Sequence, residues 1–197
     1  MLKPTRRVIS GVDKNQQSTI IADEKVATLT PYEIFPCFQL QNLFYTENNP
    51  QSLQTRHEDK PYDINLPQGA FRFMTIRMPT IDEMAKEMRA AGQEVPTDWT
   101  KFNLHSTDSA DYIYILSGEI NYVVGDKTTQ LKQGDFLAQI GPEHTWVNDG
   151  NAPCMVLCIM IGVKPKRPMG LMRGKIHIGE DFNEPLPPDV LAAFEGK

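Results

Sequence analysis

The chain has 197 residues, of which 40% are hydrophobic and 23% charged, and its formal net charge is −5. This length suits one domain with a substantial core, and the composition is that of a globular protein. No basic patch of the kind found in nucleic-acid-binding proteins is visible. The longest apolar run, residues 155–163, is shorter than the roughly 20 residues of a membrane-spanning helix. We therefore expect neither a nucleic acid nor a membrane as a partner.

The cysteines and the first residues of the chain predict the cellular compartment of the protein. The first residues are basic, but no apolar stretch follows them, so no secretory signal is predicted. The three cysteines, Cys37, Cys154 and Cys158, form no C-x-x-C pair. An odd number of cysteines in such a chain predicts reduced thiols and a cytoplasmic protein.

Residues 1–79 are predicted to form a β-rich N-terminal arm. Residues 6–10 and 18–22 flank a turn at Asp13, a pattern that predicts a hairpin with a longish loop. A further strand is expected from Phe38 to Tyr45, followed by a polar, proline-containing loop from Thr46 to Gln68. Residues 71–78 then alternate apolar and polar side chains, as a half-buried strand does.

One short helix is expected over residues 80–92. Thr80 and Glu83 have the spacing of a capping box, in which each side chain binds the other residue's backbone N–H. Apolar residues follow at helical spacing, and Gly92 supplies the stop. We expect the methionines on this face to pack in the core.

Residues 100–163 are predicted to be the core of an antiparallel barrel. Short strands recur at regular intervals and end at glycine turns, which is typical of an all-β sandwich or barrel. The last strand is apolar on both faces, so it should be central and covered. The expected strands are residues 112–116, 120–124, 128–131, 136–140, 144–148 and 155–163. Residues 1–163 are thus expected to form a single domain, with a tail of residues 164–197 that packs on the barrel or on a partner subunit. A short helix is expected within this tail at residues 189–194.

Alternation along the strands also predicts which side chains share the barrel interior. One strand is expected to begin at Phe102, and others contain Asp111 and His144. A few polar groups on apolar walls are typical of a ligand site. The predicted interior sets are Asn103, His105 and Thr107; Asp111, Ile113 and Ile115; and His144, Trp146 and Asn148.

Two motifs in this region resemble those of the cupin family. The first runs from His105 through Thr107 to Asp111 and then, after six residues, to Gly118. The second follows Gly134-Asp135 and runs from Gln139 through Gly141 and His144 to Asn148. They resemble in particular a mostly uncharacterised subgroup of single-cupin proteins with the patterns H-x-T-D-x-x-D-Y and Q-x-G-x-x-H-x-W-x-N. The resemblance implies an all-β, cupin-type antiparallel β-barrel (a double-stranded β-helix).

The resemblance also implies a metal site with departures from the usual pattern. Metal-binding cupins usually offer two histidines and a glutamate from the first motif and a histidine from the second. Here His105 and His144 match, whereas Thr107 replaces the second histidine and Asp111 the glutamate. Two imidazoles and one carboxylate suit Fe, Zn, Mn or Ni and leave open positions. The alternative is no metal, with Asp111 hydrogen-bonded to Thr107 or to a turn and the histidines in the core.

Three functions stay open from these residues. His105, Asp111 and His144 are the candidate catalytic residues and the candidate metal ligands. The substrate pocket is predicted to include Asn103, Thr107, Ile113, Gln139 and Trp146, and Asn148 is expected to be a turn residue. The first expected function is a divalent-metal-dependent oxygenase, lyase or isomerase acting on a small molecule. The alternatives are a metal-free acid–base dehydratase or isomerase and a non-catalytic small-molecule binding protein. By analogy with cupins a homodimer is expected, and His57 and His177 are expected to be solvated.

Overall fold

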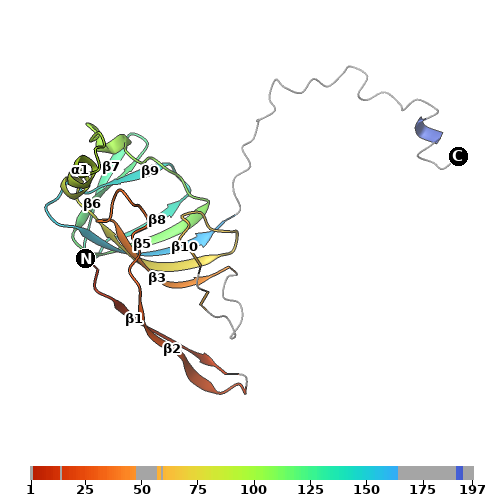
Figure 1. The fold of residues 1–197 in the computed structure, drawn as a ribbon. Helices are drawn as coiled ribbons and strands as arrows, with labels where there is room; N and C mark the ends of the chain where they lie inside the picture. Colours follow the sequence, from red (N-terminus) through yellow and green to blue (C-terminus); the bar gives the residue numbers. More distant parts are fainter. Residues whose placement is uncertain (1, 14, 48–56, 59, 164–189, 193–197) are drawn as a thin grey trace. The chain divides into compact units, whose positions relative to one another are not determined.

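The computed structural model describes residues 2–13, 15–47, 57–58, 60–163 and 190–192 (Figure 1). The chain divides into two compact units, Met1–Pro165 and Lys166–Lys197. All strands within the described residues belong to the first unit. In the second unit only residues 190–192 are described, and these are helical. The rest of the expected tail helix and His177 lie outside the described residues. Within the described part of the chain, no helix is both long and apolar enough to span a membrane.

The described residues of the first unit form ten strands in three antiparallel sheets, one α-helix and one 3₁₀ turn. The sheets have the strand orders β1-β2, β3-β4-β10-β5-β8 and β7-β6-β9. The elements are β1 (Thr5–Val12), β2 (Ser18–Val26), β3 (Gln39–Thr46), β4 (Phe71–Met78), α1 (Ile81–Ala90), η1 (Trp99–Lys101), β5 (Ser109–Ser117), β6 (Glu119–Val124), β7 (Lys127–Lys132), β8 (Phe136–Ile140), β9 (His144–Val147) and β10 (Cys154–Gly162).

The expected strands are confirmed, except for the one expected to begin at Phe102, because period-two alternation and glycine turns are strong local signals. In β4, buried and half-buried residues alternate along the whole strand. β10 lies between β4 and β5, as its apolar character predicted. Cys154 and Cys158 are buried on this strand, in accord with a packing role.

The five-stranded and three-stranded sheets share one apolar core. Ile113 and Ile115 of β5 meet Ile120 and Tyr122 of β6 in a single buried cluster that also includes residues of β4 and β10. Burial of such side chains stabilises the fold by roughly 1.5–3 kcal/mol each. One row of cross-strand neighbours crosses the larger sheet on the same face: Tyr45, Arg72, Met160, Asp111 and Gln139.

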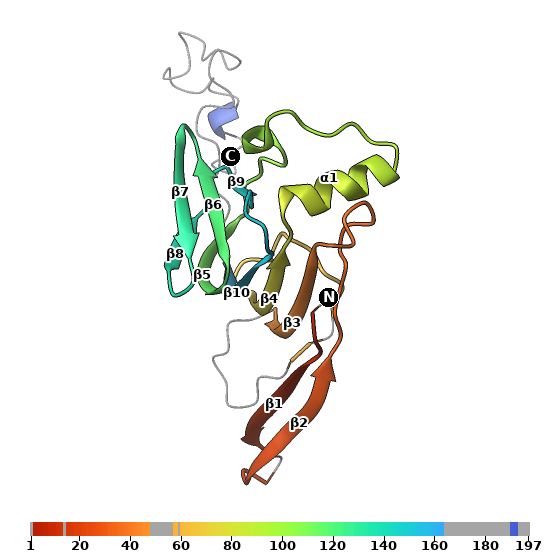
Figure 2. The same cartoon turned by 90° about the vertical axis from the view of Figure 1, so that its left-hand side faces the viewer.

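The helix α1 directly follows β4 and lies at one end of the sheets, as Figure 2 shows. The predicted capping box is confirmed: the Thr80 hydroxyl accepts the Glu83 amide at 3.1 Å, and the Glu83 carboxylate accepts the Thr80 amide at 3.1 Å. Glu83 also pairs with Arg77 of β4 at 2.6 Å. The cap and the ion pair together hold the start of α1 against the sheet.

Candidate functional site

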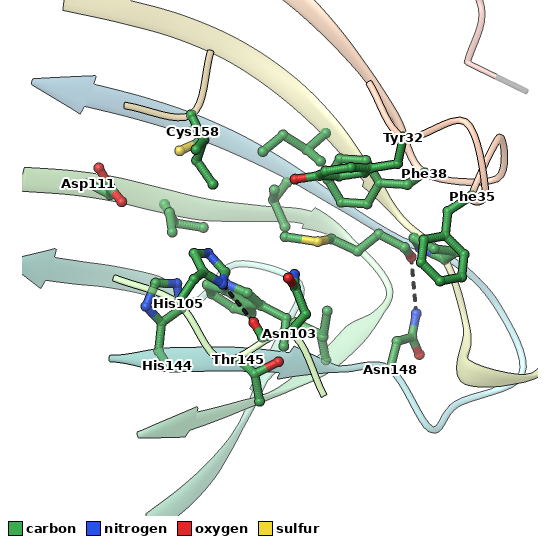
Figure 3. Close-up of a pocket in the computed structure, with 18 of the residues that line it drawn as sticks. Tyr32, Phe35, Phe38, Asn103, His105, Asp111, His144, Thr145, Asn148 and Cys158 are labelled. Atoms are coloured by element: carbon green, nitrogen blue, oxygen red, sulfur yellow. Dashed lines mark hydrogen bonds between the residues drawn. The ribbon is translucent and has the colours of Figure 1, made fainter. Parts of the chain in front are cut away.

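A pocket of about 190 Å³ opens within the first unit (Figure 3). Its two ends differ in chemistry. His105, His144 and Asp111 lie toward one end, and Tyr32, Phe35 and Phe38 lie toward the other. A small, mostly apolar pocket with a few polar groups is the usual form of a small-molecule site.

The polar end contains a pair of imidazoles. His105 and His144 face each other across an isolated antiparallel bridge, with backbone N–H···O distances of 3.1 and 2.9 Å. Their ring centroids are 4.4 Å apart. The backbone thus brings together two histidines that are 39 positions apart in the numbering of the chain.

Both imidazoles are held in the same tautomer by backbone carbonyls. Nδ1 of His105 lies 2.8 Å from the Asn103 carbonyl oxygen, and Nδ1 of His144 lies 2.9 Å from that of Pro142. A carbonyl oxygen only accepts, so each Nδ1 carries the hydrogen. Each Nε2 is then left with a lone pair that can accept a proton or a hydrogen bond.

His144 is kept neutral by its surroundings. Its side chain is buried, and the rings of Tyr122 and Trp146 lie 5.6 and 6.2 Å from it. Burial, together with the neighbouring His105, lowers the pKa of His144 to about 4, although the Pro142 carbonyl acts in the opposite direction. At neutral pH this imidazole is therefore uncharged.

The carboxylate of Asp111 is buried and engaged by neighbours on its own side of the barrel. The Ser109 hydroxyl donates to Oδ1 at 2.6 Å, and Gln139 Nε2 donates to Oδ2 at 3.0 Å. Thr107 Oγ1 lies 3.4 Å from Oδ2. Burial raises the pKa of Asp111, although these hydrogen bonds act to lower it. The hydrogen bond to Thr107 expected as the alternative role of Asp111 is thus present.

The donor set does not match a three-ligand metal site. Among the described residues, no three His, Cys, Asp or Glu side chains are grouped so that they could hold a metal ion. The two imidazoles are paired, but Asp111 directs its oxygens at Ser109 and Gln139. The residues expected as ligands are therefore not assembled as a two-histidine, one-carboxylate set in this structure.

The side-chain amide of Gln139 is hydrogen-bonded through one of its two polar atoms. Gln139 is the cross-strand neighbour of Asp111, its side chain is only 3% exposed, and it lines the pocket. Its Oε1 is buried and has no hydrogen-bond partner. A buried polar atom without a partner is rare in folded proteins and calls for an explanation.

The expected strand beginning at Phe102 is wrong. The helical turn η1 ends at Lys101, Asn103 has a φ of 53°, and β5 begins only at Ser109. Asparagine tolerates this left-handed conformation better than most residues. His105 therefore enters the pocket from an irregular segment that is joined to β9 by the bridge between His105 and His144 and by the hydrogen bond from the Thr145 hydroxyl to the Phe102 carbonyl.

The other predicted residues have clear places. The five predicted pocket residues, Asn103, Thr107, Ile113, Gln139 and Trp146, all line the cavity. Asn148 also lines it, but its amide donates to the Met78 and Ala152 carbonyls and accepts the Gly150 amide, which is the expected turn role. The expectation that His57 is solvated is wrong: it is half-buried, and its Nδ1 accepts the Tyr45 amide.

The apolar end was not predicted from the sequence. Tyr32, Phe35 and Phe38 lie between β2 and β3 and line the pocket with Trp99 and Phe102. The ring of Phe102 packs edge-on against Phe35 at 6.0 Å and against Trp99 at 5.2 Å. The density of aromatic residues in the segment 31–38 was the available signal.

Cys158 lines the pocket but is a poor nucleophile. Burial and the nearby Asp111 carboxylate both raise the pKa of its thiol. The thiolate is the reactive form of cysteine, so this thiol stays protonated and unreactive.

Comparison with known proteins supports the fold. Residues 93–160 match the Cupin domain family model. No curated protein is similar to the chain in sequence. A cupin 2 conserved barrel domain protein from Salinispora arenicola is 10% identical, with a TM-score of 0.31. The alignment covers 46% of this chain and 62% of that protein.

Two other solved structures align with more of the chain. The cupin domain of Cnp3 from Schizosaccharomyces pombe has 12% identity and a TM-score of 0.42, covering 80% of this chain and 87% of its own. A putative ethanolamine utilization protein Q from Salmonella typhimurium has 12% identity and a TM-score of 0.40, covering 82% and 99%.

The matched segment contains η1 and strands β5 to β9 and most of β10, so it holds His105, Asp111 and His144 together. The predicted mostly β, cupin-type fold is confirmed. The match to the family model covers residues 93–160 of the 197-residue chain.

Proposed function

We propose that this protein is a metal-independent enzyme that moves a proton on a small molecule held in the cupin pocket. The observation that carries the proposal is the imidazole pair: His105 and His144 lie with their rings 4.4 Å apart, and both Nδ1 atoms are bound to backbone carbonyls. Both Nε2 atoms are thereby left available. Histidine is the most frequent general acid–base group in enzymes.

The low pKa of His144 keeps its Nε2 unprotonated at neutral pH. A base with a pKa of about 4 is neutral and unprotonated at pH 7. Once it has taken a proton, the buried imidazolium is a strong acid and readily gives the proton back. His105, at its side, is a second acceptor for the same proton. This behaviour fits isomerisation, in which a proton leaves one carbon and returns to the substrate.

Asp111 has a supporting role in this proposal. Its carboxylate holds Gln139 and Ser109 by hydrogen bonds of 3.0 and 2.6 Å. It also interacts electrostatically with His105. Asp111 is therefore a positioning residue for the polar end.

The first test is the metal content of the purified protein, measured by elemental analysis for the wild type and for His144→Ala. The proposal expects well below one equivalent of Fe, Zn, Mn or Ni in both, with or without reconstitution. Close to one equivalent in the wild type that is lost in His144→Ala would overturn the metal-independent reading and restore the metal enzyme expected from the sequence.

The second test measures proton transfer directly. The probe is 2-hydroxy-1-phenylethanone, an uncharged aromatic hydroxyketone whose C–H next to the carbonyl can exchange. The wild type in D₂O with excess EDTA should catalyse deuterium incorporation, followed by proton NMR, and His144→Gln should not. Binding of the probe without exchange would favour the non-catalytic binding protein instead.

A further inference from the structure

The free carbonyl of Gln139 points to a recognition role. The side chain is 3% exposed and lines the pocket, while Oε1 has no hydrogen-bond partner. Leaving a buried acceptor unpaired is unfavourable. A ligand that donates a hydrogen bond to this oxygen recovers that cost when it binds.

The orientation of this amide follows from its neighbours. Gln139 Nε2 donates to Asp111 Oδ2 at 3.0 Å, and the same carboxyl group accepts from Ser109 at 2.6 Å. A carboxylate only accepts hydrogen bonds, so the NH₂ of Gln139 must face it. The carbonyl is the end without a partner, and the Asp111 network fixes the orientation of the amide.

The nearby imidazoles also favour a ligand that donates hydrogen bonds. With Nδ1 of His105 and of His144 engaged by carbonyls, both Nε2 atoms are acceptors when the rings are neutral. The polar end therefore offers three acceptors at His105, His144 and Gln139.

The charges of the residues that line the pocket disfavour an anionic ligand. Among the described residues that line the pocket there is no lysine and no arginine, whereas Asp111 is there. A phosphate or carboxylate group would be buried without a positive partner, which is strongly unfavourable. The other end of the cavity, with Phe35 and Phe38, suits an apolar or aromatic body.

We propose that Gln139 is a specificity-determining residue that accepts a hydrogen bond from an uncharged ligand with O–H or N–H donors at one end of an aromatic or aliphatic body. The inference rests on the proposed function, because it names the substrate class of the same pocket. Phenols and alcohols belong to this class, and phosphorylated or carboxylated compounds do not.

Three probes of similar shape test the inference: 4-propylphenol, its methyl ether 4-propylanisole, and 4-propylbenzoate. Their dissociation constants for the full-length protein are measured by ligand-detected NMR at pH 7. The phenol should bind about tenfold more tightly than the methyl ether, since the ether cannot donate. The benzoate should bind more weakly than the ether.

The variant Gln139→Leu should bind the phenol about tenfold more weakly and the methyl ether unchanged, so that the preference disappears. The exposed Gln130→Leu on β7 is the matched control and should keep the wild-type preference. Urea unfolding checks that each variant is folded, and Gln139→Met replaces the leucine variant if it is not.

The outcomes separate the two proposals. Equal affinity of the wild type for phenol and ether, tighter binding of benzoate, or an unchanged preference in Gln139→Leu would each overturn the inference while leaving metal-independent proton transfer intact. Failure of all three probes to bind overturns the inference as well, and the metal and exchange measurements then decide the proposed function separately.

Discussion

The two ends of the pocket differ in how their side chains are held. At the polar end His144 and Asp111 are 2% and 4% exposed, and each has defined hydrogen-bond partners. At the apolar end Phe35 and Phe38 are half-buried and come from a segment with no strand or helix. Reacting groups need fixed positions, whereas apolar contacts need only shape.

The two ends also differ in their origin along the chain. His105, Asp111 and His144 all lie within the segment that matches the Cupin model. Tyr32, Phe35 and Phe38 lie outside it. The segment that matches the Cupin model thus supplies the histidines and the carboxylate, and the N-terminal arm supplies aromatic side chains of the apolar end. We therefore expect changes at one end to alter turnover and changes at the other to alter binding.

The largest effect is expected from His144→Gln, which removes the proposed base while keeping a side chain of similar size. The rate of deuterium exchange into 2-hydroxy-1-phenylethanone should fall about 100-fold or more, with little change in the half-saturating concentration. Proton NMR measures both. A rate within a factor of three of wild type would show that the polar end is not the reacting end.

The next effect concerns acid stability. The unfolded chain protonates His144 near pH 6.5, but the folded protein only near pH 4, so acid favours the unfolded state over this interval. The contribution of neutral His144 to the free energy of unfolding is fully present above pH 6.5. As the pH falls to 4, this free energy decreases by on the order of 3 kcal/mol.

Urea unfolding at pH 7 and pH 4.5 measures this loss in the wild type and in His144→Gln. The loss between the two pH values should be smaller in the variant, because glutamine does not titrate. The other titrating groups are common to both proteins and so cancel in the comparison. An equal loss in both proteins would contradict the neutral, buried state of His144.

At the apolar end, Phe35→Ala should raise the half-saturating concentration about tenfold and leave the maximal rate unchanged, because it removes apolar contact only. The matched control is Phe136→Ala, since Phe136 is 60% exposed and does not line the pocket. The same exchange assay measures both variants. A fall in maximal rate for Phe35→Ala would contradict the expectation that the apolar end affects binding alone.

The smallest effect tests the helix that borders the apolar end, since Ile81 and Met84 of α1 line the pocket. Thr80→Ala removes the cap and should lower the free energy of unfolding by about 1 kcal/mol. Thr129→Ala, on an exposed position of β7, should change it by no more than about 0.5 kcal/mol. Urea denaturation compares them. Equal effects would show that the capping box contributes nothing measurable.

Local patterns were enough to predict most of the fold. Alternation along residues 71–78 and glycine turns after each short strand identified the strands within a few residues of their observed ends. The spacing of Thr80 and Glu83 identified the start of α1. These signals are local because they reflect the backbone hydrogen bonding and face alternation of one element at a time.

The site was predictable only in part. The two motifs singled out His105, His144 and Asp111, and alternation placed Asp111 on an interior face. The same alternation failed at residues 102–108, where η1 and the positive φ of Asn103 interrupt the expected strand. A strand pattern does not reveal such an interruption, because it assumes an extended backbone throughout.

Contacts between distant segments lay beyond any local pattern. The pairing of Asp111 with Gln139, which turns the carboxylate away from the role of a third metal ligand, depends on the register of β5 against β8. The meeting of Phe35 with Phe102 depends on how the N-terminal arm closes over the sheets. Spacing along the chain can identify the reacting side chains, but which neighbours satisfy them is decided by the packing of the sheets, since hydrogen bonds and apolar contacts act through space.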